Sequence, residues 1–152
     1  MKRSVSIMFA YVFLAIGSNA LLQAQTPPAT EKITQGVYPV YARSPQVWRF
    51  TIDPKTMANA TVAGRFSITE GVPKNIEVFV FNEENYFKWR SEDDAVKATA
   101  KPIYSSGGRK ADGDLNVKVT EAGHYYVVFS NLFAYEGIKT LNADVKLQYD
   151  KR

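Results

Sequence analysis

The sequence predicts an all-β fold: a single antiparallel β-sandwich of about eight strands, with one short helix in a crossover loop. Three observations predict it. Apolar and polar residues alternate with a period of two in several segments. Turn-forming residues such as Asp53-Pro54 and Ser106-Gly107-Gly108 separate these segments. The chain has 152 residues, which is a length that suits one domain.

The first residues have the order of a secretory signal peptide. Lys2 and Arg3 precede an apolar core over residues 5–16, and small residues follow it. This core is short for a membrane span, which needs about 20 residues. We therefore expect a signal peptide over residues 1–24 and export to the periplasm or the medium. An uncleaved signal anchor is the alternative.

The boundaries of the mature domain follow from this leader. Cleavage after Ala24 is favoured, and cleavage after Ala20 is the second option. Residues 25–32 are polar and contain prolines, so we expect a flexible N-terminal segment there. Residues 33–152 are then the folded domain.

The predicted strands are of two kinds. Two runs, residues 76–81 and 125–129, are apolar on both faces, as interior strands are when a loop or helix covers the outer face. Further strands are expected over residues 37–41 and 102–105. Four segments alternate as half-buried strands do, at residues 47–52, 61–68, 115–120 and 143–149. The turn predictions between them include Asp112-Gly113 and Ala122-Gly123.

One helix is expected directly after the run at 76–81. Asn82 can cap it, and Glu83 and Glu84 suit its positive N-terminal end. Tyr86 and Trp89 then belong to an apolar stripe, and the charged stretch up to residue 100 completes the crossover loop.

Composition excludes several classes of function. The chain has no cysteine, so disulfides and thiolate metal sites are excluded. Removing Lys2 and Arg3 with the leader leaves 17 basic and 15 acidic residues, a net charge of +2. No run of lysine and arginine stands out, so nucleic-acid binding is not expected. No apolar stretch after Ala24 is long enough for a transmembrane span.

The order of these features resembles the GOLD-type β-sandwich, the lumenal domain of the p24 cargo proteins and of similar exported prokaryotic domains. The residues that carry the resemblance lie within residues 46–149. They are GRF at 64–66, IEVFVFNEENYFKW at 76–89, YSSG at 104–107 and AGHYYVVFSN at 122–131. The resemblance implies a non-catalytic domain that binds proteins or lipids. The cysteine pair, coiled coil and C-terminal membrane span of p24 proteins have no counterpart here, so the resemblance does not extend to cargo sorting.

Catalytic and metal sites find little support in the residues. His124 is the single histidine, and no partner for it can be identified from the sequence. Residues 112–114 (Asp-Gly-Asp) could offer carboxylates to calcium, but the full loop pattern is missing, and a hairpin turn explains them. The acidic residues Glu83, Glu84 and 92–94 fit a helix start and a solvated loop better than a glycosidase pair. We predict no catalytic residue, metal or cofactor.

Aromatic side chains are the best candidates for binding. Tyr86, Trp89 and Tyr135 are the residues expected to contact a partner, since exposed aromatics serve protein and carbohydrate recognition. Burial of Trp89 as part of the core or its lid is the competing interpretation. Asn131, at the end of an apolar run, is expected to hydrogen-bond the local backbone.

The sequence therefore predicts an exported, non-catalytic binding or accessory domain for a protein, envelope or lipid partner. A carbohydrate-binding module is the first alternative, and a hydrolase is the least favoured one. Asn59-Ala60-Thr61 matches the pattern of an N-glycosylation acceptor, which has meaning only in a host that glycosylates exported proteins.

Overall fold

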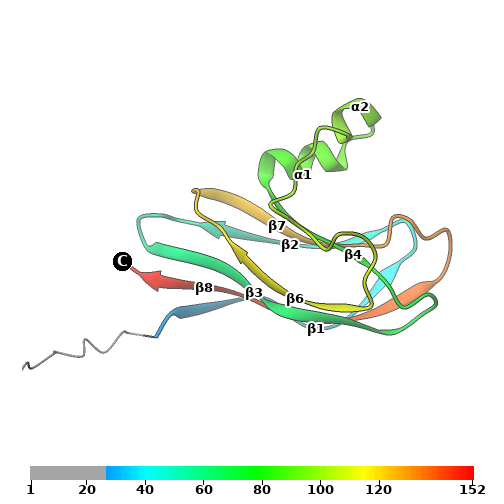
Figure 1. Ribbon diagram of the computed structural model, residues 1–152, viewed down its shortest axis with the longest axis horizontal. Helices are drawn as coiled ribbons and strands as arrows, with labels where there is room; N and C mark the ends of the chain where they lie inside the picture. Colours follow the sequence, from blue (N-terminus) through cyan, green and yellow to red (C-terminus); the bar gives the residue numbers. More distant parts are fainter. Residues whose placement is uncertain (1–26) are drawn as a thin grey trace, which may run out of the picture.

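The computed structural model describes residues 27–152, and the predicted signal peptide lies outside these residues. Two four-stranded antiparallel sheets face each other (Figure 1), with strand orders β1-β8-β3-β6 and β2-β7-β4-β5. The predicted all-β sandwich is thereby confirmed. The strands are β1 Ala29–Tyr41, β2 Pro45–Ile52, β3 Met57–Glu70, β4 Glu77–Asn82, β5 Tyr104–Ser105, β6 Asp112–Lys118, β7 Gly123–Ser130 and β8 Ile138–Lys151.

The core lies between the two sheets and collects the inward side of each alternating strand. In β3, Val62, Phe66 and Ile68 are buried, while Arg65 between them is exposed. Strand β8 follows the same rule with the opposite parity from residue 141 to residue 149. Burial of one face by a period-two pattern is what makes these segments strands.

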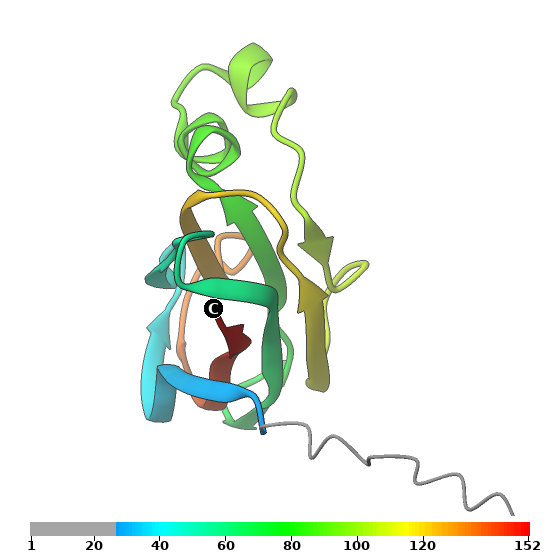
Figure 2. The same cartoon turned by 90° about the vertical axis from the view of Figure 1, so that its left-hand side faces the viewer.

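Strands β4 and β7 are buried on both faces, as their composition predicts. Their inward residues join the main core, and Phe81, Tyr126 and Val128 form a second cluster on the outer face. Helix α1, Glu83–Arg90, covers that cluster. Figure 2 shows both helices on the outer side of this second sheet.

The helix begins where the sequence places it. The Asn82 side-chain oxygen accepts a hydrogen bond from the Asn85 backbone N–H at 3.0 Å, which is an N-cap. A second helix of one turn, α2 Asp94–Lys97, lies in the same crossover and was not expected. The Asp93 carboxylate caps it by accepting from the N–H groups of Ala95 and Val96.

Two further differences concern strand boundaries. Strand β1 begins at Ala29, so the second half of the segment predicted to be flexible is a strand, with Ala29–Lys32 paired to β8. Asp112-Gly113 is not a turn but the start of β6. Gly113 points inward opposite Phe66, whose ring occupies the space a side chain would need, and the chain reverses instead at Gly107 and Gly108.

Candidate functional site

Four connections meet at one end of the sandwich, and we call this the loop end. It consists of residues 42–44, 71–76, 106–111 and 131–137, several of which lie at the right of Figure 1. Backbone hydrogen bonds join these connections to one another. They run from Ala42 N to Gly137 O at 3.0 Å, from Arg43 N to Asn131 O at 3.1 Å and from Ile76 N to Lys110 O at 2.8 Å.

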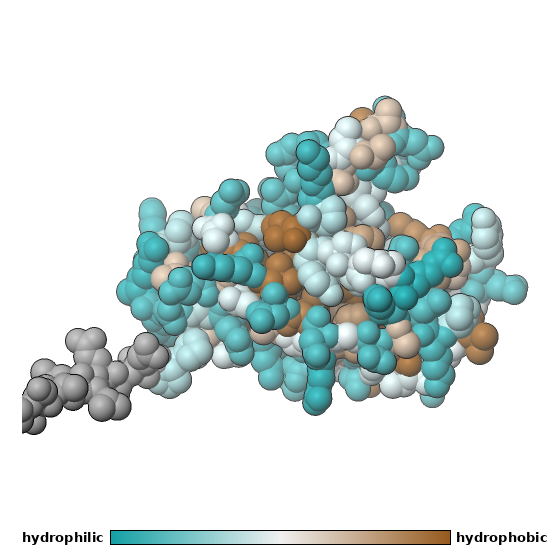
Figure 3. Space-filling model, viewed as in Figure 1, coloured by the Kyte–Doolittle hydropathy of each residue, from teal (hydrophilic) through white to brown (hydrophobic). Residues whose placement is uncertain are grey.

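Large apolar side chains are exposed at the loop end. Val72 is 93% exposed and Tyr135 is 83% exposed. Leu132 is also exposed there, and Tyr41 and Ile138 are exposed in the strand ends that flank it. These five are among the nine large hydrophobic residues that are exposed in the described chain, and we call them the apolar tip. Isolated surface hydrophobics need no explanation, but a gathering of this kind marks an interaction site. Figure 3 shows brown and teal atoms intermixed at this end.

Positive charge accompanies the apolar tip. The four connections carry Arg43, Lys74, Arg109 and Lys110, all exposed, against a single carboxylate, Glu136. The other three connections, residues 53–56, 83–103 and 119–122, carry seven carboxylates and five cations. The near-neutral total therefore hides a local excess of positive charge in the four loop-end connections, and we call the loop end the basic end.

A buried lysine on β8, Lys139, is hydrogen-bonded to one of the loop-end connections. Lys139 is 3% exposed, and its Nζ donates to the backbone oxygen of Asn75 at 2.5 Å and to Asn75 Oδ1 at 2.9 Å. The same Nζ lies 4.5 Å from the centre of the Phe133 ring, over which the Arg109 guanidinium also lies at 4.0 Å. Burial, and then the charge of Arg109, lower the pKa of Lys139.

Asn131 does not act as predicted. Its side chain is fully buried, and neither its amide nitrogen nor its amide oxygen has a hydrogen-bond partner within residues 27–152. The backbone of Asn131 fixes the turn instead, since its carbonyl accepts from Arg43 and Ala134.

The structure does not bring the three predicted binding residues together. Tyr86 is half-buried and stacks on Tyr126, with ring centres 4.0 Å apart and planes at 10°. Trp89 is half-buried against the rings of Phe79 and Phe81, as a lid over the second cluster. Tyr135 belongs to the loop end, where the Arg43 guanidinium lies 4.9 Å from its ring centre.

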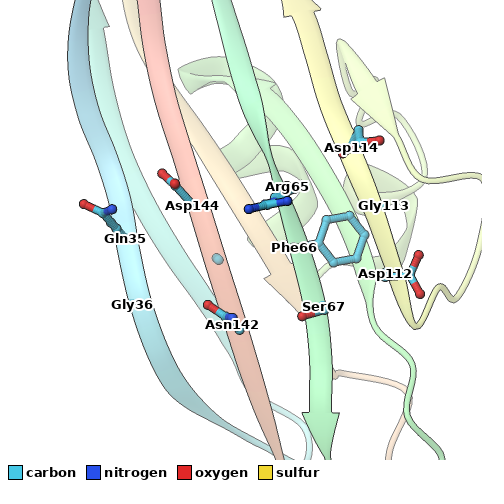
Figure 4. A pocket seen from close by; sticks show the side chains of 11 residues that line it. Gln35, Gly36, Arg65, Phe66, Ser67, Asp112, Gly113, Asp114, Asn142 and Asp144 are labelled. Atoms are coloured by element: carbon cyan, nitrogen blue, oxygen red, sulfur yellow. The ribbon is translucent and has the colours of Figure 1, made fainter.

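A shallow hollow on the outer face of the first sheet is the second feature of interest (Figure 4). Its volume is about 570 Å³. Arg65 on β3 lies at its centre, opposite Asp144 on β8 and Asp114 on β6 in register. Lys146 Nζ lies 3.4 Å from Asp144 Oδ1, close enough for charge attraction but without hydrogen-bond geometry. Gln35, Ser67, Asp112 and Asn142 complete its polar lining.

The residues weighed for catalysis have structural partners. His124 Nδ1 lies 2.9 Å from Thr51 Oγ1, its cross-strand neighbour. Glu84 pairs with Lys88, which lowers the pKa of the Glu84 carboxyl, and Glu83 accepts from the Tyr126 hydroxyl at 3.3 Å. Within residues 27–152 no three histidine or acidic side chains are placed to hold a metal ion.

Neither a protein-family model nor a curated protein matches this sequence. The resemblance to GOLD-type domains therefore stays a prediction, because a two-sheet sandwich is not specific to them. Neither helix of the described residues has the length and apolar character needed to cross a bilayer.

Proposed function

We propose that this protein is an exported, non-catalytic binding or accessory domain that recognises a protein, envelope or lipid partner with its loop end. One observation carries the proposal: the apolar tip coincides with the basic end of the sandwich. Connections that a rigid sandwich holds in place are common sites of recognition, because their side chains can vary without loss of the core. The predicted signal peptide supports export of the domain.

The rigidity of the loop end supports this proposal. The Lys139–Asn75 hydrogen bonds and the backbone bonds between connections hold the connections together. A partner would then not have to order these loops on binding, which lowers the entropic cost of association. The Tyr135 ring and its neighbouring Arg43 are also of the residue types that dominate binding energies.

Site-specific photo-crosslinking in the native host tests the proposal. A photoreactive amino acid at Tyr135 is expected to form a crosslink to a cell component, which mass spectrometry then identifies. Phe87 is the matched control, because it is an exposed aromatic on α1, away from the loop end. Crosslinks at Phe87 with none at Tyr135 would place recognition elsewhere. Turnover of a hydrolase substrate that is lost in His124→Ala would contradict a non-catalytic role.

The hollow on the first sheet favours a second candidate, a carbohydrate-binding module. Its amide, carboxylate and guanidinium groups are the partners that sugar hydroxyls require. The test is a glycan array with the wild-type protein and with Asn142→Ala. A hit that this substitution abolishes supports glycan binding in the hollow, and an array without hits counts against it.

A further inference from the structure

We propose that the loop end binds the surface of an anionic lipid bilayer, with Val72 and Tyr135 inserted among the headgroups and the surrounding cations paired with lipid phosphates. This inference rests on the proposed function and names the class of partner. It is carried by the way in which the apolar and basic residues of the loop end are distributed.

The exposed apolar side chains of the tip come from separate connections. Val72 is almost wholly free of neighbours, and it extends from a different connection than Leu132 and Tyr135 do. A protein partner would need a complementary surface of about 800 Å² on this side of the interface. A bilayer is fluid and adapts to side chains that come from different connections, so it does not need such a complementary surface.

The cations lie where lipid phosphates would meet them. The Arg43 guanidinium lies 4.9 Å from the centre of the Tyr135 ring, which makes an aromatic and a cationic group adjacent. Tyrosine rings favour the interfacial depth of a membrane, and a guanidinium can pair with a phosphate in a bidentate way. Lys74 follows Val72 by two residues and is exposed in the same connection.

Charge selects an anionic surface over a neutral one. The connections of the loop end carry four exposed cations and one carboxylate. Near an anionic membrane this local excess of positive charge attracts the loop end to the lipid. Lys139 is hydrogen-bonded beneath the surface and is therefore not counted among the lipid-facing cations.

The decisive experiment uses the absence of cysteine from the sequence. A polarity-sensitive dye is attached to Val72→Cys or, as the matched control, to Val96→Cys on α2. The exported protein is then mixed with phosphatidylcholine vesicles, with or without phosphatidylglycerol. We expect a blue shift at position 72 only, only with the anionic vesicles, and weaker at high salt because salt screens the attraction.

Vesicle co-sedimentation gives the second measurement. Arg43→Gln and Lys74→Gln are each expected to weaken binding to the anionic vesicles about fivefold. Lys97→Gln on α2 is the matched control and is expected to have no effect. Thermal unfolding of each variant confirms that the fold is intact.

The outcomes distinguish this inference from the proposed function. No blue shift at position 72, or equal shifts at positions 72 and 96, would overturn the lipid proposal. A protein crosslinked at Tyr135, together with no binding to vesicles, would leave the loop end as the binding site and make the partner a protein. The absence of both a crosslink at Tyr135 and binding to vesicles would contradict both proposals.

Discussion

Gly64 shows how closely the strands of the first sheet pack. A Cβ atom added to this glycine would lie 2.1 Å from the backbone oxygen of Asp144 on β8. Backbone atoms cannot yield as a flexible side chain does, so Gly64→Ala must separate β3 from β8 locally. We expect it to lower the free energy of unfolding by about 3 kcal/mol, measured by urea denaturation.

Gly107→Ala is the control for this prediction. Nothing lies within 4 Å of the added Cβ, and the residue has a φ of 67°. Its expected cost is the strain of a left-handed conformation alone, about 1 kcal/mol. Equal losses for the two variants would mean that the close approach at Gly64 is not what matters.

Lys139 makes stability depend on pH in a predictable direction. Its pKa in the fold lies below the usual 10.5 because the amine is buried, and because Arg109 is near. The unfolded chain therefore binds this proton more tightly than the folded protein does. The free energy of unfolding rises as the pH passes the folded-state pKa, and it levels off above pH 10.5. Lys139→Met removes this contribution.

The measurement is the difference in unfolding free energy between wild type and Lys139→Met as the pH is raised. Wild type is expected to gain relative to the variant. Tyr86, Tyr125 and Tyr149 have the opposite effect: their pKa values are raised in the fold, so their contribution to the free energy of unfolding falls as the pH rises. Taking the difference between wild type and variant cancels this effect. A constant difference would show that the amine is as well solvated in the fold as in the unfolded chain.

Helix α1 is an element whose function is to cover the outer face of β4 and β7. Asn82 holds its start, since the Asn82 Oδ1 accepts from the backbone and side-chain nitrogens of Asn85 at 3.0 and 2.8 Å. Asn82→Ala is expected to cost about 1 kcal/mol. Hydrogen exchange should quicken in residues 83–90, and a dye that binds apolar surface should detect the uncovered Phe81 and Tyr126.

The cap of the second helix is the matched control for Asn82→Ala. Asp93 caps a helix of four residues with no buried side chain, so Asp93→Ala is expected to cost about 0.5 kcal/mol or less. Equal costs for the two variants would show that α1 contributes no more to the fold than an exposed turn does.

Most elements could be predicted from the sequence because side-chain burial alternates visibly along them. The exceptions are segments whose structure depends on a partner strand. Residues 29–32 are polar apart from Ala29, and they form a strand because β8 offers them backbone hydrogen bonds. Asp112-Gly113 favours a turn locally, but the Phe66 ring needs the space that Gly113 leaves. Neither the pairing with β8 nor the position of the Phe66 ring can be read from the local sequence pattern.

The candidate site belongs to the scale of the whole molecule, and for that reason little of it could be predicted. Tyr135 was singled out as an aromatic residue in a loop. Val72, Arg43 and Arg109 carry no sequence pattern that relates them to Tyr135 or to one another. They share one end only because β1, β3, β6 and β8 pair in the observed order. The excess of cations in the loop-end connections is likewise invisible in a composition that is close to neutral.

The extent of the cooperative unit can be tested at its N-terminal boundary. A chain that begins at Ile33, the boundary predicted from the sequence, lacks the pairing of Ala29–Lys32 with β8. It also lacks the hydrogen bond from the Tyr149 hydroxyl to the Glu31 carboxylate at 2.5 Å. A chain that begins at Ala29 keeps both and serves as the control.

We expect the chain beginning at Ile33 to unfold in a single transition, because both sheets share one core, with a free energy lower by about 2–4 kcal/mol. The Tyr149 hydroxyl provides an independent probe. Its pKa is raised chiefly by the hydrogen bond to Glu31, so it should fall toward 10 in the shortened chain. Ultraviolet titration measures this directly, with Glu31→Gln in the full domain as a second variant. Equal stabilities for the chains beginning at Ile33 and Ala29 would mean that the pairing of Ala29–Lys32 with β8 is dispensable. The domain would then start where the sequence pattern places it.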